Sequence, residues 1–158
     1  MTLASADGLV RYDRDIALGR TTTVDGIGRL AREEGFRAIL DLNTEGEPDE
    51  LLSPNVEATW AHTFELEHGR VSTDPGRLRS ARADEFLVEL ERIAKPVFVH
   101  SRHGRRAAAL LTVHLGLERR CSGREALARA RALGIDCQRE DLREFVASEV
   151  DARVRPPG

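Results

Sequence analysis

The sequence predicts a single α/β domain built on a mostly parallel central sheet flanked by helices. The length of 158 residues suits one domain with a substantial core. Apolar runs typical of buried strands alternate with amphipathic helical segments along the chain. A polar loop follows the apolar run 97–99, which is where open parallel sheets place their ligands. We place the domain at residues 9–152, after an N-terminal segment 1–8 and before a mobile tail 153–158.

The first half of the chain is predicted to supply three strands around one helix. Residues 9–12 and 16–18 form two short strands that a polar tripeptide separates. Thr22 or Thr23 can cap a helix that runs to residue 34, because apolar residues repeat at helical spacing in it. Gly35 ends this helix, residues 36–42 form a strand, and residues 43–49 have the composition of a loop.

The second half is predicted to be richer in helix. Residues 59–66 form a strand, residues 67–76 are irregular, and residues 79–93 form an amphipathic helix. The short apolar run 97–99 is a central buried strand, and residues 106–117 form the next helix. Ser122 and Glu125 make a capping box that opens a helix to residue 133, and the last helix covers residues 138–150.

The most informative segment joins a strand to a helix and reads Val97-Phe98-Val99-His100-Ser101-Arg102-His103-Gly104-Arg105-Arg106. A loop between a strand and a helix N-terminus can turn its backbone N–H groups inward, and the positive end of the helix then favours an anion. A guanidinium adds a bidentate grip suited to phosphate oxygens, a role that we assign to Arg106. We therefore predict that residues 101–106 bind phosphate and that His100 orients the loop.

This loop resembles the active-site loop of the cysteine-dependent phosphatases, His-Cys-x-x-Gly-x-x-Arg in the protein-tyrosine and dual-specificity families. It is closer to the shorter Cys-x-x-Gly-x-Arg loop of a small bacterial phosphatase-like family that is also found fused to metallo-β-lactamase domains. Ser101, Gly104 and Arg106 match the shorter form, whereas the longer form needs Arg where Ala107 stands. The resemblance covers about residues 9–150, is specific at the loop, and implies a dual-specificity-phosphatase-like fold with Ser101 and Arg106 in catalytic positions.

Ser101 is the main departure from this pattern, because it occupies the position of the nucleophilic Cys. Inward N–H groups and an Arg can keep a thiol ionised at neutral pH, but a Ser hydroxyl is far too weak an acid. Two interpretations follow: an engineered or otherwise inactivated enzyme that traps substrate, or a natural relative that binds phosphate without cleaving it. The intact remainder of the loop favours the first interpretation.

Hydrolysis of a phosphoester also needs a general acid that protonates the leaving oxygen. Asp74 is the best candidate, because it lies between a predicted strand and the long helix 79–93. An Asp before a Pro is equally typical of a turn or of a helix start, and the family motif does not define this position. Asp41, Glu65 and Glu67 are weaker alternatives.

Composition excludes several other classes of function. A net charge of −3 offers no overall electrostatic case for nucleic-acid binding. Cys121 and Cys137 are too few for a disulfide scaffold, and no His or Cys spacing suggests a metal site, so we expect neither metal nor cofactor. The N-terminus has no basic start and no long apolar core, and we expect a cytoplasmic protein without membrane partners.

Three functions remain compatible with the sequence. The first is a phosphomonoester hydrolase of the protein-tyrosine or dual-specificity type, here in an inactive Ser101 form. The second is a module that binds phosphorylated partners without catalysis. The third is a rhodanese-like sulfur carrier, which would need a Cys in the loop. Under the first two, the partner is a phosphorylated protein or a small phosphoester, and phosphate, sulfate and vanadate are ligands.

Overall fold

The computed structural model describes residues 9–154 and contains a five-stranded sheet in the order β1-β2-β5-β3-β4. The strands are β1 (Val10–Arg11), β2 (Ile16–Arg20), β3 (Ala38–Asp41), β4 (Glu67–Arg70) and β5 (Val97–Ser101). Only the β1–β2 pair is antiparallel; β2, β5, β3 and β4 run parallel. The helices are α2 (Val24–Arg32), α3 (Pro54–Thr63), α4 (Ser80–Arg92), α5 (Arg105–Arg119), α6 (Gly123–Ala132) and α7 (Glu140–Val154). The predicted fold class, one mostly parallel α/β domain, is confirmed.

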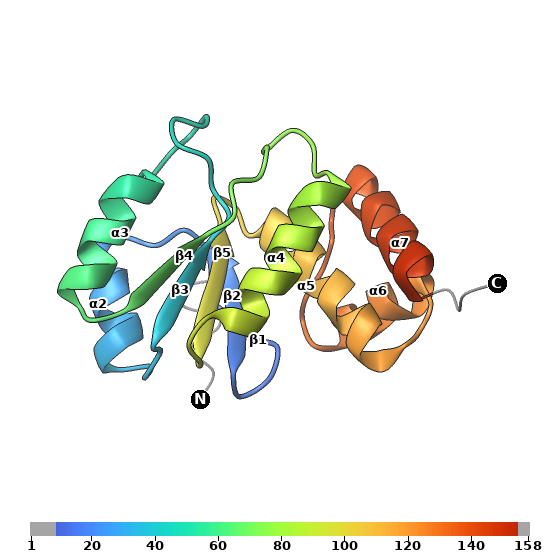
Figure 1. The fold of residues 1–158 in the computed structure, drawn as a ribbon, viewed down its shortest axis with the longest axis horizontal. Coiled ribbons are helices and arrows are strands. Elements are labelled where there is room, and N and C mark those ends of the chain that lie inside the picture. Colours follow the sequence, from blue (N-terminus) through green and yellow to red (C-terminus); the bar gives the residue numbers. More distant parts are fainter. Residues whose placement is uncertain (1–8, 155–158) are drawn as a thin grey trace.

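The helices cover both faces of the sheet (Figure 1). α2 and α3 pack on one face, over a small apolar cluster that includes Ile39 and Phe98. α4 and α5 pack on the other face, over a larger core that includes Leu40 and Val99, and α6 and α7 pack against α5. Because neighbouring residues of a strand point to opposite faces, β3 and β5 supply both cores and are buried throughout.

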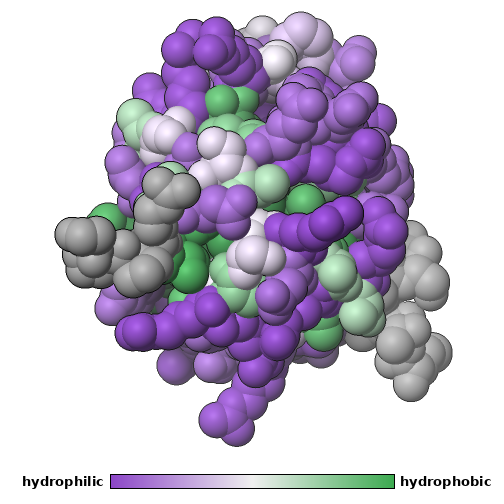
Figure 2. Space-filling model, turned by 90° about the vertical axis from the view of Figure 1, so that its right-hand side faces the viewer, coloured by the Kyte–Doolittle hydropathy of each residue, from purple (hydrophilic) through white to green (hydrophobic). Residues whose placement is uncertain are grey.

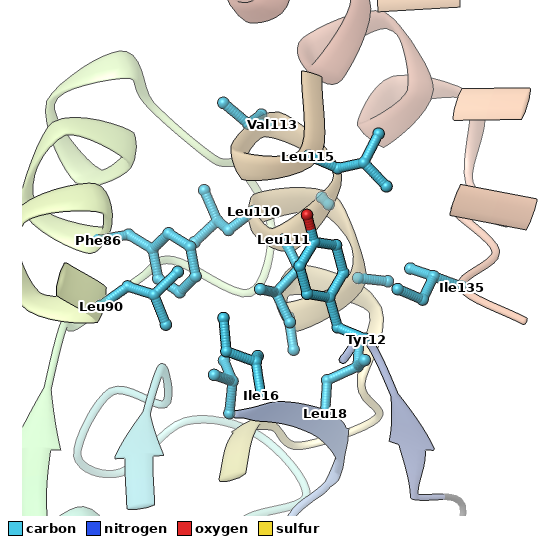
Figure 3. Packing of buried hydrophobic residues seen from close by; sticks show 14 of the residues in the cluster. Tyr12, Ile16, Leu18, Phe86, Leu90, Leu110, Leu111, Val113, Leu115 and Ile135 are labelled. Carbon is cyan, nitrogen blue, oxygen red and sulfur yellow. The ribbon is translucent and has the colours of Figure 1, made fainter. Parts of the chain in front are cut away.

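The larger core fixes the helix that follows the polar loop (Figure 3). Leu110 of α5 points toward Phe86 of α4, and Leu111 points toward the sheet beside Tyr12. Ten consecutive residues of this helix, from Arg106 to Leu115, include only one that is not buried. The N-terminal end of α5 is therefore held rigidly against the carboxyl end of β5.

Capping side chains start the helices largely as the sequence predicts. Thr23 Oγ1 accepts the Gly26 N–H at 3.1 Å and starts α2. Ser122 Oγ accepts the Glu125 N–H at 3.1 Å and starts α6. In both cases the side chain satisfies one of the first N–H groups, which have no partner inside the helix.

The predicted strand over residues 59–66 is wrong. Pro54–Thr63 forms α3, because Ser53 Oγ caps it through the Val56 N–H at 3.2 Å and Pro54 stands in its first turn. Aromatic and β-branched residues in this stretch favour a strand locally, but capping and the packing of Ala61 against the sheet decide for a helix. His62, predicted to lie in a strand, is accordingly an exposed helix residue.

The true strand lies in the stretch predicted to be irregular. β4 (Glu67–Arg70) pairs only with β3 and forms the edge of the sheet. Three of its four residues are Glu, His and Arg, so it lacks the apolar alternation by which strands are recognised. An edge strand tolerates such residues because one side of it faces solvent.

α7 continues through Val154, two residues past the predicted domain boundary, while the segment 1–8 and the last four tail residues lie outside the described residues. Hydrophilic residues cover most of the face near α6 and α7 (Figure 2). None of the helices between residues 9 and 154 is both long and apolar enough to cross a bilayer. A cytoplasmic location stays a prediction.

Candidate anion-binding site

The predicted phosphate loop lies at the carboxyl end of the central strand β5, between β2 and β3. Ser101 is the last residue of β5 and pairs with Arg20 of β2, and α5 begins at Arg105. The register also sets His100 directly opposite Asp41 of β3. The parallel register therefore gathers the ends of three strands around the loop, as expected for a ligand site in an open sheet.

Gly104 allows the loop to turn tightly into the helix. Its φ is 82°, which is the left-handed region that glycine adopts at little cost. A Cβ at this position would lie 3.4 Å from the backbone of Gly19. The Gly104 N–H donates to the Ser101 carbonyl at 3.2 Å, and the Thr21 N–H donates to the same oxygen at 2.9 Å. The loop is thus a closed turn in this conformation.

Ser101 lies at the base of this turn and is fully buried. Its Oγ accepts the Ala107 N–H at 3.3 Å, so a first-turn amide of α5 points at the atom in the nucleophile position. An amide and a helix N-terminus both stabilise negative charge at such an atom. The same contact does little for a hydroxyl, which stays protonated at neutral pH.

Arg106 is buried and its terminal nitrogens hold a second loop, residues 43–47. Nη2 and Nη1 donate to the two carboxylate oxygens of Glu47 at 2.6 and 3.1 Å. Nη1 also donates to the Thr73 carbonyl at 3.0 Å, and Nη2 donates to Asn43 Oδ1 at 3.3 Å. The guanidinium therefore makes a bidentate ion pair inside the protein.

This ion pair limits how Arg106 can hold an anion. Nε makes no hydrogen bond within residues 9–154 and is not fully buried, so it is the donor left for a ligand. A two-pronged grip through Nη1 and Nη2, as the sequence suggests, would require Glu47 to give up the guanidinium. The sequence offered no signal for Glu47 beyond its place in a polar loop.

The other arginines of the loop form a basic rim. Arg105 and His103 line a cavity of about 350 Å³ beside β2. Arg102 lines a second cavity of about 290 Å³ together with Arg20, and its Nε donates to the Asp49 carbonyl. Partial burial lowers the pKa of His103, and the charges of Arg102 and Arg105 lower it further. The rim is positive at neutral pH and attracts anions.

Asp74, the candidate general acid, lies in an exposed turn after β4. Its Oδ1 accepts the Gly76 N–H at 2.7 Å, which is the turn role that its position before Pro75 suggests. It also lines a cavity of about 520 Å³ together with Glu47. The preceding residue, Thr73, accepts hydrogen bonds from the Arg106 guanidinium through its carbonyl and hydroxyl oxygens. Asp74 therefore directly follows, in the sequence, a residue that contacts Arg106. A catalytic role stays a prediction.

His100 belongs to a buried group of charged side chains beneath the loop. Its Nε2 lies 2.8 Å from Glu57 Oε2, and His68 Nε2 lies 2.9 Å from the same oxygen. Asp41 lies slightly farther away, with Oδ1 3.7 Å from His100 Nε2 and Oδ2 3.6 Å from His68 Nε2. His100 Nδ1 meets Thr21 Oγ1 at 3.0 Å. His100 thereby joins the end of β5 to Thr21, the residue after β2. Its role in orienting the loop stays a prediction.

Burial disfavours the charged forms of these four side chains, whereas attraction between opposite charges favours them, so the two effects shift each pKa in opposite directions. Burial alone would lower the pKa of His68, but hydrogen bonds with Asp41 and Glu57 raise it to about 9. Burial also opposes the charge of Glu57, yet the His100 charge and hydrogen bonds hold the pKa of this carboxyl well below its usual range. Burial raises the pKa of Asp41. Glu57 is therefore ionised, and its carboxylate lies between the imidazoles of His100 and His68.

Sequence reasoning missed this cluster because its members are far apart in the chain. Asp41, Glu57, His68 and His100 come from four different elements, and two of those elements were predicted incorrectly. Strand alternation could have placed Asp41 and His100 on one face of the sheet, given the register. These donors are also the residues that could hold a metal ion: ligand atoms of Asp41, Glu57 and His100 lie within 4.8 Å of one another.

Comparisons with known proteins connect this architecture to phosphatases. Neither the family models nor the curated protein sequences include a match to the chain. A supposed phosphatase of Neisseria meningitidis aligns with a TM-score of 0.73 at 16% identity, over 89% of this chain and 96% of that one.

Two further solved structures agree. The catalytic domain of the PP-IP phosphatase SIW14 of Saccharomyces cerevisiae, solved with citrate, aligns with a TM-score of 0.68 at 16% identity, covering 88% of this chain and 83% of that one. PTPMT1 aligns with a TM-score of 0.68 at 24% identity, covering 92% and 97%. The chain therefore has the fold of the cysteine-dependent protein-tyrosine and dual-specificity phosphatases.

Proposed function

We propose that this protein binds the phosphoryl group of a phosphomonoester at residues 101–106 and, with Ser101 in the nucleophile position, does not hydrolyse it. One observation carries the proposal: the loop joins the central strand to α5 in a phosphatase fold, with the Ala107 N–H directed at Ser101 Oγ. The loop is built to stabilise an anion at this atom, and the hydroxyl cannot supply one. An inactivated enzyme that traps substrate and a natural module that binds phosphorylated partners would both bind the phosphoryl group in this way.

Binding requires a change in the loop. Ser101 is fully buried and the Gly104 N–H is turned toward the Ser101 carbonyl, so this N–H must turn away from the carbonyl before it can donate to an oxyanion. Part of the binding free energy is used for this rearrangement. We therefore expect millimolar rather than micromolar affinity for a bare inorganic oxyanion.

The first test is thermal stabilisation by oxyanions. Sulfate, phosphate, tungstate and vanadate bind the folded state and should raise Tm as their concentration passes the Kd, following mass action. Sodium chloride at equal ionic strength is the control for screening. A chloride response equal to the sulfate response, or no response at tens of millimolar oxyanion, would contradict the proposed site.

Arginine variants then test which side chain holds the anion. Arg106→Lys should weaken oxyanion binding about tenfold or more, because an ammonium lacks the guanidinium Nε–H and fork geometry. Arg102→Lys and Arg105→Lys should each change it less than about threefold, since rim charges act mainly through the local field. Circular dichroism confirms that each variant is folded. Equal losses in all three variants would show that the rim, rather than Arg106, holds the ligand.

The basic rim favours an acidic ligand. Arg20 borders both cavities beside the loop, next to Arg105 in one cavity and Arg102 in the other. A ligand with a second anionic group, such as a phosphorylated acidic peptide, would gain attraction there that phenyl phosphate cannot. This preference should fall with ionic strength.

The role of Asp74 can be tested in a protein variant that is expected to turn over substrate. In a Ser101→Cys protein, Asp74→Asn should slow an alkyl phosphate about tenfold or more, because alkoxide leaving groups need a proton. The nitrophenolate of p-nitrophenyl phosphate leaves without much protonic help and should be nearly unaffected. If Asp74→Asn changes the rate for neither substrate, Asp74 acts only as a turn residue.

The sulfur-carrier alternative has no comparable support. It needs a thiol in the loop, and both cysteines, Cys121 and Cys137, are buried in the core around α5, α6 and α7. The compared solved structures are phosphatases. Thiosulfate sulfurtransferase activity in the Ser101→Cys protein, without phosphatase activity, would favour this alternative after all.

A further inference from the structure

The four-residue group beneath the loop is unusual in its charge and burial. Asp41, Glu57 and His100 are completely inaccessible, and the His68 side chain is 7% exposed. Two carboxylate oxygens, Asp41 Oδ2 and Glu57 Oε1, are fully buried and have no hydrogen-bond partner. Unpaired buried oxygens of this kind are costly, and each one calls for a specific explanation.

We propose that Asp41, Glu57, His68 and His100 form a structural site for one divalent transition-metal ion, with zinc as the expected occupant. Imidazole nitrogens and carboxylate oxygens are both zinc ligands, and a site with four protein ligands lacks the open position that catalytic zinc sites keep. This proposal concerns the architecture below the loop and is independent of phosphate binding.

The distances between donor atoms suit such an ion. Tetrahedral ligands with bonds of about 2.0–2.1 Å lie about 3.3–3.4 Å from one another. The two histidine Nε2 atoms lie 2.8 and 2.9 Å from Glu57 Oε2 and 3.7 and 3.6 Å from the oxygens of Asp41. These separations bracket the tetrahedral value. Ligand atoms of Asp41, Glu57 and His100 lie within 4.8 Å of one another, and His68, which contacts both carboxylates, would complete the set by moving toward them.

Charge balance also supports an ion. With neutral imidazoles, the two carboxylates carry the negative charge that one divalent cation neutralises. Without an ion, neutrality needs two protons on these four side chains, and the two Nε2 atoms that face Glu57 Oε2 are places for them. Metal binding would release these protons to solvent, and nitrogen lone pairs and carboxylates would form the new bonds.

The surrounding contacts orient the donors as a metal site requires. His100 would bind through Nε2 while its Nδ1 meets Thr21 Oγ1 at 3.0 Å, and Asn43 Nδ2 donates to the same hydroxyl oxygen at 2.8 Å. The Asn43 N–H donates to Asp41 Oδ1 at 2.9 Å. Hydrogen bonds at the far nitrogen of a ligating His fix its tautomer and ring orientation. The partly exposed His68 offers the route of entry.

Metal content and metal binding test the proposal. The purified full-length protein is analysed by plasma mass spectrometry, stripped with a chelator, and titrated with zinc alone by calorimetry in two buffers of different ionisation enthalpy. We expect one zinc per chain, release of protons on binding, and a higher Tm for the zinc-loaded protein. Folded stripped protein that takes up no zinc at micromolar concentration would show that protons alone fill the cluster and would overturn the proposal.

Cobalt and matched variants locate the ion. Cobalt bound in place of zinc should show visible bands of tetrahedral geometry without thiolate charge-transfer absorption, which excludes Cys121 and Cys137 as ligands. His68→Gln should weaken zinc binding at least about 100-fold, whereas His62→Gln, on the exposed face of α3, should leave it unchanged. If His68→Gln fails to fold, the cobalt spectrum of the unchanged protein still decides. Octahedral or thiolate bands, or full zinc binding by folded His68→Gln, would place the ion elsewhere.

Discussion

Replacing Ser101 by Cys is expected to convert the protein into a metal-independent aryl phosphatase. The Ala107 N–H lies 3.3 Å from the atom in this position, at the N-terminal end of a 15-residue helix. An amide and a helix terminus both lower the pKa of a thiol, so a large thiolate fraction should exist at neutral pH. The thiolate attacks phosphorus and displaces the aryl oxide, and water then hydrolyses the S–P bond of the thiophosphate intermediate, which releases inorganic phosphate and restores the thiolate.

The expected effect is large. Hydrolysis of p-nitrophenyl phosphate should rise at least about a thousandfold above that of the Ser101 protein, which corresponds to about 4 kcal/mol of transition-state stabilisation. Vanadate and thiol alkylation should abolish this activity, and a chelator should not. The matched control is Ser101→Ala, which retains the loop without any nucleophile and should be as inactive as the Ser101 protein.

The result separates the two interpretations of Ser101. A Ser101→Cys variant that turns over phosphoester shows that only the nucleophile is missing from otherwise complete machinery. A folded variant that binds oxyanions yet turns over no substrate shows that other residues of the site have also diverged. The first candidate is then Arg106, because its guanidinium is held by Glu47. This second outcome favours a protein that reads phosphate without processing it.

The fold and the loop could be predicted from the sequence because both depend on local pattern. The apolar run before Ser101 and the turn at Gly104 are adjacent in the chain, and their register follows from burial. α3 escapes prediction because residues 59–64 favour a strand locally, whereas the cap at Ser53 and the packing of Ala61 require a helix.

The environment of the site could not be predicted because it depends on long-range contacts. Glu47 reaches Arg106 across 59 residues and Glu57 reaches His100 across 43. No spacing rule covers such pairs, since they arise from the sheet order and from the face on which each helix packs. The four-residue charged cluster needs α3 and β4 in place, and these are the two elements that sequence patterns misassigned.

The second large effect should come from breaking the Glu47–Arg106 pair. Both side chains are almost fully buried, with exposed fractions of 3% and 7%. Removing one partner of a buried ion pair leaves the other charged without compensation, which costs about 3–5 kcal/mol. Glu47→Gln and Arg106→Met should each lower Tm by about 6–20 °C, because about 1 kcal/mol corresponds to about 2–4 °C for a chain of this size.

A double-mutant cycle separates the pair from its surroundings. In Glu47→Gln/Arg106→Met neither charge is buried, so the loss of stability should be smaller than the sum of the two single losses by about 2 kcal/mol or more. Glu45→Gln is the matched control, because Glu45 pairs with Arg70 at 3.4 Å with exposed fractions of 42% and 36%. Breaking that exposed pair should cost less than about 1 kcal/mol. Additive single effects would mean that Thr73 and Asn43, rather than Glu47, hold the guanidinium, and that Arg106 can turn toward an anion without first breaking an ion pair.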